Sequence, residues 1–174
     1  MGVLDLLVLL KINWRAHFAY SGENVFHVIV KNGWYCSLCE LQHLLDDKFT
    51  TRLNQKNDLG QTCLHVAVRI HRGQRAIKMI EKLVKYGTDL NVRERNSSDT
   101  VLHIAVGNQD YELAAWLCQQ PHIDLEAENY YSHMAFKKAS KNKDKEMAII
   151  LKTYGTIPRQ DFLATAKKVF LISG

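Results

Sequence analysis

The sequence has few of the residues that mark disulfide-rich, collagen-like or membrane-spanning proteins. Its 174 residues include four cysteines, two prolines and nine glycines. That is too little cysteine for a disulfide scaffold, and too little proline and glycine for a collagen or a proline-rich linker. No apolar run approaches the roughly 20 residues that a membrane-spanning helix needs. Hydrophobic residues make up 47% and charged residues 24%, which is typical of one globular domain or one short repeat array.

Positive charge is concentrated towards one end of the chain. The net charge is +5, yet residues 1–60 hold six basic and six acidic residues, and residues 61–136 hold eight and nine. Residues 137–174 hold nine and three, so the whole excess lies there. Such a segment attracts acidic partners or nucleic acid, or is simply the solvated face of a helix.

A short motif with a central histidine recurs along the chain. Copies at 23–28, 61–68 and 99–106 place His27, His65 and His103 at intervals of 38 positions. A degraded fourth copy at 133–139 carries Lys137 where the histidine stood. A motif that recurs at a fixed interval predicts a repeat architecture.

A second helical pattern follows each motif. In the second copy, Ala76, Ile77, Ile80, Leu83 and Val84 share one face of a helix, and Gly87 suits a left-handed C-cap after it. The third copy predicts a helix over 112–120, and the fourth predicts one over 145–154 that Gly155 ends. Each unit therefore has two amphipathic helices and no core of its own, so we expect the units to stack.

Six small or polar residues of the motif have predicted structural roles. Thr62 and Thr100 are placed to cap the first helix of their units, with His65 and His103 three residues on. Ala67 and Ala105 are small enough to let neighbouring helices approach closely.

The motif resembles the signature of ankyrin repeats. Thr62-Cys63-Leu64-His65-Val66-Ala67 and Thr100-Val101-Leu102-His103-Ile104-Ala105 are similar to Thr-Pro-Leu-His-x-Ala, with Cys63 and Val101 replacing the proline. Segment 87–91 resembles the Gly-Ala-Asp-Val-Asn sequence that leads into ankyrin hairpins. The interval of 38 exceeds the roughly 33 of the family. We expect the extra residues in the turn at 70–74 or in the connector at 46–51.

The resemblance implies an all-α ankyrin-repeat solenoid of about four helix-turn-helix repeats with short hairpin loops. The predicted organisation is an N-terminal capping helix over 1–21, repeats over 22–155 and a C-terminal helical tail over 156–174. The repeats are placed at about 22–53, 54–90, 91–123 and 124–155.

Three segments, 22–27, 61–68 and 121–127, look like the IκB group of ankyrin proteins, and the start at 22–27 is most like the viral ankyrins of polydnaviruses, the vankyrins. This resemblance implies a non-enzymatic inhibitor that binds host Rel/NF-κB factors and suppresses immune signalling. It would act in the cytoplasm of the host cell, with the nucleus as a second location. IκB proteins are removed through a phosphorylated Asp-Ser-Gly signal, and no Asp-Ser-Gly occurs here.

Ankyrin proteins bind partners through hairpin tips and the inner helical face. The predicted partner-binding residues lie at three tips: Lys56, Asn57 and Asp58; Arg93, Glu94 and Arg95; Asn129, Tyr130 and Tyr131. The alternative is that these tips are polar because they are solvated, although Tyr130 and Tyr131 are favoured interface anchors.

Other functions have weaker support in the sequence. Cys36 and Cys39 with His43 resemble half a zinc site, but no second cysteine pair follows, and packing within a helix is the better interpretation. One histidine per repeat leaves neighbours about 10 Å apart, too far to share a metal ion. We expect no cofactor, small-molecule ligand or membrane partner, and no nucleic acid. The alternatives are an adaptor for a different host protein and a nucleic-acid factor that uses the lysines at 137–145.

Overall fold

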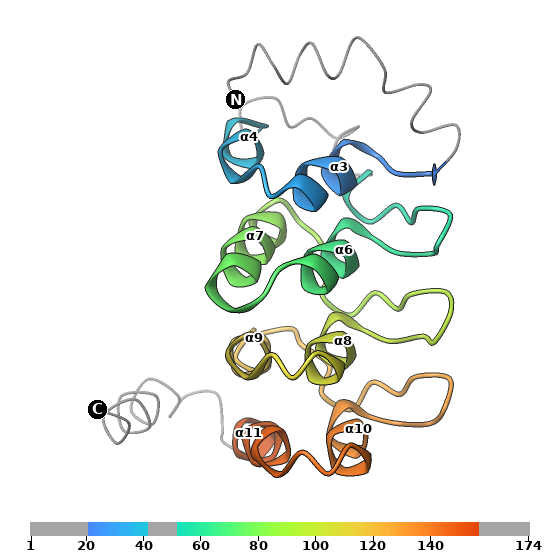
Figure 1. The fold of residues 1–174 in the computed structure, drawn as a ribbon, viewed down its shortest axis with the longest axis vertical. Helices are drawn as coiled ribbons and strands as arrows, with labels where there is room; N and C mark the ends of the chain where they lie inside the picture. Colours follow the sequence, from blue (N-terminus) through green and yellow to red (C-terminus); the bar gives the residue numbers. More distant parts are fainter. Residues whose placement is uncertain (1–20, 42–51, 157–174) are drawn as a thin grey trace, which may run out of the picture.

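The chain folds as a stack of helix pairs. The computed structural model describes residues 21–41 and 52–156, and within these ranges every regular element is a helix. The helices form two columns that run side by side (Figure 1). The inner column is α3 (Val25–Asn32), α6 (Cys63–Ile70), α8 (Val101–Gly107) and α10 (Ala135–Lys141). The outer column is α4 (Tyr35–Glu40), α7 (Gly73–Lys85), α9 (Tyr111–Cys118) and α11 (Lys145–Thr156). The predicted all-α solenoid is confirmed.

Two predicted segments lie almost wholly outside the described residues. These are the capping helix over 1–21 and the tail over 156–174, of which the structure describes only Ser21 and Thr156. The prediction that Gly155 ends the last helix is wrong, because α11 continues to Thr156.

The long interval between His65 and His103 does not arise in the turn at 70–74, which was one of its two predicted origins. The turn between α6 and α7 consists only of His71 and Arg72, so it does not hold the extra residues. Instead α7 has 13 residues, whereas α9 at the same place in the next repeat has eight. The helix ends in a Schellman motif, in which Thr88 N–H donates to the Leu83 carbonyl at 3.2 Å. Gly87 adopts φ +96° there, which confirms its predicted left-handed conformation. The connector at 46–51 lies outside the described residues.

Buried apolar side chains join each helix pair to the next. Phe26, Leu64 and Leu102 occupy the same position in three successive inner helices, and each is at most 1% exposed. Ala67 and Ala105 are fully buried, as their predicted packing role requires. Because each pair alone would leave these side chains in water, the stack forms as one unit.

A capping box built on histidine begins three of the inner helices. In the second repeat, the backbone N–H of Thr62 donates to Nδ1 of His65 at 3.1 Å, and the Thr62 hydroxyl oxygen lies 2.7 Å from the same nitrogen. Thr100 and His103 repeat this arrangement, and Asn24 takes the place of threonine beside His27. Thr62 and Thr100 are the N-cap residues of α6 and α8.

The far nitrogen of the imidazole reaches the next repeat. Because Nδ1 accepts a backbone hydrogen bond, Nε2 carries the proton of the neutral ring. Nε2 of His27 lies 2.9 Å from the Gln61 carbonyl, and Nε2 of His103 lies 2.8 Å from the His133 carbonyl. His27 and His103 thus cap their own helices and hold the following hairpins. Nε2 of His65 has no hydrogen bond of normal geometry. The backbone carbonyls of Asp99 and Val92 nonetheless act to raise the pKa of this ring.

Aspartates begin two of the outer helices and also join them to the preceding pair. Asp110 accepts the Leu113 N–H at 3.1 Å, and its second oxygen accepts the Gly73 N–H of α7 at 2.9 Å. Asp144 accepts the Met147 N–H at 3.0 Å in the same way, and also the hydroxyl of Tyr111 in α9 at 3.2 Å. The two columns therefore use the same device, a cap that also binds a neighbouring repeat.

Replacing His103 with alanine should cost about 2–4 kcal/mol of unfolding free energy. The change removes a buried ring and leaves the Thr100 N–H and the His133 carbonyl without their partner. Lys137→Ala is the matched control, since Lys137 is exposed at the equivalent position of α10 and its loss should cost under about 0.5 kcal/mol. Urea unfolding followed by circular dichroism measures both, and equal losses would refute the assigned role.

Acid should destabilise the fold through these histidines. Burial lowers the pKa of His27, His65 and His103, to about 4 for His65 from 6.5. Protons therefore bind the unfolded chain more tightly, and the stabilisation present above pH 6.5 is lost as the pH falls towards 4. For His65 the loss is about 2 kcal/mol at pH 5 relative to pH 8.

The measurement is the urea midpoint at pH 8, 6 and 5 for the wild-type chain and for His65→Gln. The urea midpoint of the variant should change less steeply with pH between pH 6.5 and 5. Glu94 also acts on His65, but its own pKa is lowered, so its contribution is lost only in stronger acid. Identical slopes for the two chains would contradict the assignment to His65.

Candidate protein-interaction surface

Three hairpin loops project from the side of the inner column (Figure 1). Backbone hydrogen bonds join them into one row. Asp58 N–H donates to the Ser21 carbonyl at 3.1 Å, Arg95 N–H to Gly60 at 3.2 Å, and Tyr130 N–H to Ser97 at 2.9 Å. Gly60 suits this row because its φ is +72° and a β-carbon would lie 2.1 Å from that of Arg95. The tips are therefore held at fixed spacing along the stack.

Two of the predicted contact residues serve the hairpins themselves. Asn57 is 3% exposed, and its side-chain oxygen accepts the Gln61 N–H at 2.9 Å. Asn129 is 7% exposed, and its side-chain oxygen accepts the N–H groups of Tyr131 and His133 at 3.0 and 3.2 Å. These amides satisfy the turn backbone, which is a common use of asparagine.

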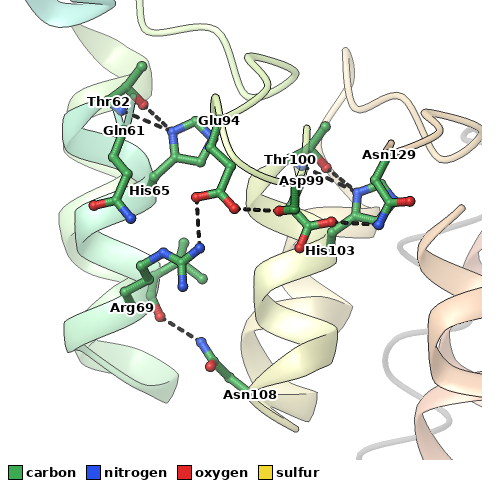
Figure 2. A network of polar contacts seen from close by, with 12 residues as sticks. Gln61, Thr62, His65, Arg69, Glu94, Asp99, Thr100, His103, Asn108 and Asn129 are labelled. Carbon is green, nitrogen blue, oxygen red and sulfur yellow. Dashed lines mark hydrogen bonds and ion pairs between the residues drawn. The ribbon is translucent and has the colours of Figure 1, made fainter. Parts of the chain in front are cut away.

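Glu94 at the second tip is also turned inward. Its carboxylate accepts from Arg69 of α6 at 2.7 Å (Figure 2). It also accepts from the Ser97 hydroxyl at 2.5 Å, and its side chain is 3% exposed. Burial alone would raise the pKa of Glu94, but the hydrogen bonds from Ser97 and Arg69 and the charge of Arg69 outweigh it and lower the pKa. Glu94 is thus ionised and links its hairpin to the preceding inner helix.

A second buried carboxylate performs the same task one repeat later. Asp99 accepts from the Asn129 amide at 2.8 Å (Figure 2). It also accepts from Lys138 of α10 at 2.7 Å. Burial would raise the pKa of Asp99, yet these two donors hold it below the ordinary value. Lys138 is only 24% exposed in its side chain, so this lysine is part of the stack.

Six of the nine predicted contact residues remain exposed at the tips: Lys56, Asp58, Arg93, Arg95, Tyr130 and Tyr131. Tyr130 and Tyr131 are 69% and 70% exposed. Large aromatic side chains that stand in solvent on a rigid element are favoured anchors for a protein partner.

Two exposed apolar residues were not among the predicted contacts. Leu59 is 60% exposed at the first tip, and Phe136 of α10 is 43% exposed. Leu59 stands between Asp58 and Gly60, and an apolar residue inside a turn of this kind has no core to enter, which is a signal that sequence reading could have used.

Within the part of the chain that the structure describes, the cysteines are free and do not gather with other metal-binding side chains. Cys63 and Cys118 are buried, and burial raises the pKa of both thiols to about 12. Cys36 is exposed and Cys39 is half-buried on α4, while His43 lies outside the described residues. Within residues 21–41 and 52–156, no three metal-binding side chains come together.

None of the helices within residues 21–41 and 52–156 combines the length and the apolar character that crossing a bilayer requires.

Comparison with known proteins gives the family. A model of ankyrin repeats in three copies matches residues 2–129. The I-kappa-B like protein N2 of Microplitis demolitor bracovirus is 51% identical over 160 residues, which cover 90% of this chain and 87% of the relative. Protein N3 of the same virus is 43% identical and covers 86% and 92%, and protein C1 is 37% identical and covers 81% and 80%.

These matches span nearly the whole chain and agree with the helix pairs and hairpin row described above. Proteins of this kind are scaffolds for protein interaction and not enzymes. The chain belongs to the ankyrin-repeat family, within the IκB-like group of polydnavirus vankyrins.

Proposed function

We propose that this protein binds host Rel/NF-κB transcription factors and thereby suppresses immune signalling. The I-kappa-B like names of its relatives support this function. The observation that carries it is the row of hairpin tips, fixed by backbone hydrogen bonds, with Leu59, Tyr130 and Tyr131 at least 60% exposed. A rigid row of this kind presents anchors without the entropic cost of ordering loops on binding.

The proposed contacts are the six exposed tip residues together with the inner helical face. Asn57, Glu94 and Asn129 would act indirectly, because they hold the tips in place through buried hydrogen bonds. The site of action in this proposal is the cytoplasm and the nucleus of the host cell.

Tyr131→Ala should weaken binding to a purified Rel-homology domain by about tenfold or more, since a well-exposed aromatic anchor is lost. Tyr35→Ala is the matched control, because Tyr35 is also exposed, at 41%, but lies on α4 in the outer column. Its effect should stay below about twofold. Affinities from biolayer interferometry and a Rel-driven reporter in insect cells measure the outcome. Failure of the wild-type chain to bind at micromolar concentration would argue instead for a different host partner.

The proposal includes persistence after immune stimulation. No Asp-Ser-Gly occurs in the 174 residues, so the removal signal implied by the IκB resemblance has no counterpart in this sequence. The amount of protein in stimulated insect cells should remain constant when new synthesis is blocked, as measured by immunoblot. Rapid loss on stimulation would contradict this part of the proposal.

A further inference from the structure

The fourth repeat carries a concentration of exposed lysines. Lys137 and Lys141 lie on α10, Lys143 lies in the following turn, and Lys145 begins α11. Among the described residues, no carboxylate lies within ion-pair distance of these four, whereas Lys138 is bonded to Asp99. We call Lys137, Lys141 and the neighbouring Phe136 the fourth-repeat face.

Three lysines of this region contribute to lowering the pKa of the same histidine. His133 lies just before α10, and its pKa is lowered by desolvation and by the charges of Lys141, Lys137 and Lys138. Desolvation of this half-buried ring is the largest cause, and the three lysines add to it because nearby positive charge disfavours the imidazolium. The cations are thus gathered, and not merely numerous.

Exposed apolar groups adjoin the lysines. Phe136 occupies the position that Phe26, Leu64 and Leu102 hold in the earlier repeats, where the next helix pair covers it. No helix pair of the described ranges follows α10 and α11, and Phe136 is 43% exposed.

The third hairpin continues this surface. The Lys137 ammonium donates to the Ser132 carbonyl at 3.1 Å, and the rings of Tyr131 and His133 lie 6.1 Å apart. The aromatic tip and the lysines of α10 are therefore contiguous.

We propose that the fourth-repeat face binds an acidic segment of a partner protein. Carboxylates of that segment would meet the ammonium groups of Lys137 and Lys141, and an apolar side chain between them would pack on Phe136 and Tyr131. This inference goes beyond the proposed function, because it names the chemistry of a partner at one repeat and does not require that partner to be a Rel factor.

Two charge arguments favour an acidic protein segment over other occupants. Asp124, Glu126 and Glu128 are exposed on the hairpin limb that leads to Tyr130. They would repel a nucleic-acid backbone, whose phosphates continue along the strand, whereas a short acidic segment needs only the few lysines of α10.

Residues 157–174, which follow α11, do not supply the complementary charge. Residues 157–174 contain Arg159, Lys167 and Lys168 against Asp161 alone. Charge complementarity thus points to a separate molecule.

The test measures binding of the full chain to three labelled probes. The first is a peptide of about 12 residues in which Glu-Asp-Leu-Phe repeats, the second has Gln and Asn in place of Glu and Asp, and the third is an oligothymidine of about the same length. We expect the acidic peptide to bind more tightly than the others. Its affinity should fall at least about fivefold between roughly 50 and 300 mM salt, because exposed charges are screened.

The variant K137E/K141E should weaken binding of the acidic peptide by about tenfold or more, and K137Q/K141Q should have an intermediate effect. The matched control is K78E/K85E, which reverses two exposed lysines on α7 in the outer column and should change affinity less than about twofold. Circular dichroism and urea unfolding verify that each variant is folded, and the neutralising pair provides the test if charge reversal disturbs α10.

Equal binding of the acidic and neutral peptides, equal effects of the two charge-reversed variants, or tighter binding of oligothymidine would each overturn the inference. A Rel-homology domain assayed in parallel separates it from the proposed function. If the wild-type chain binds the acidic peptide but not the Rel-homology domain, only the proposed function is refuted. If the wild-type chain binds the Rel-homology domain but not the acidic peptide, only the proposed role of the fourth-repeat face is refuted.

Discussion

The structure depends on hydrogen bonds that each repeat shares with its neighbour. His27 and His103 close the first turn of their own helices through Nδ1, and each contacts a carbonyl of the following hairpin through Nε2. Such a bond is satisfied only when the next repeat is in place, and an unsatisfied buried group costs about 1–3 kcal/mol. The same dependence holds for Asp110 and Asp144 in the outer column. The repeats are therefore coupled through polar groups as well as through their apolar faces.

This coupling leaves the hairpin tips free to differ. Because Asn57, Asn129, Glu94 and Asp99 satisfy the backbone and join the repeats from within, the outermost side chains can vary without loss of these bonds. One tip presents an exposed leucine, the next presents two arginines and the third presents two tyrosines. A uniform scaffold can thus display a varied surface, which suits a protein that recognises others.

Much of the fold could be predicted because its signals are local and repeated. The interval between His27, His65 and His103 revealed the repeats, and the positions of Thr62 and Gly87 indicated a helix start and a helix end. The extra length of α7 was assigned to the wrong place, since periodicity cannot tell a longer helix from a longer turn when polar residues follow. The residues of the candidate site were harder to predict from the sequence. Glu94 and Arg95 are adjacent charged residues of one predicted tip, and the sequence does not show that their burial differs. In the structure Glu94 is buried against Arg69, whereas Arg95 is exposed.

The sequence by itself determined the number, order and kind of the repeating units, because capping, helical periodicity and small packing residues act within about ten positions of the chain. Only the tertiary structure decided which polar residues face inward, since the partners of Asp99 and Glu94 are 39 and 25 positions away. It also decided that Phe136, equivalent in sequence to the buried Leu102, is exposed. Burial is a property of what lies next to a residue in space, and for this stack the neighbour belongs to another repeat.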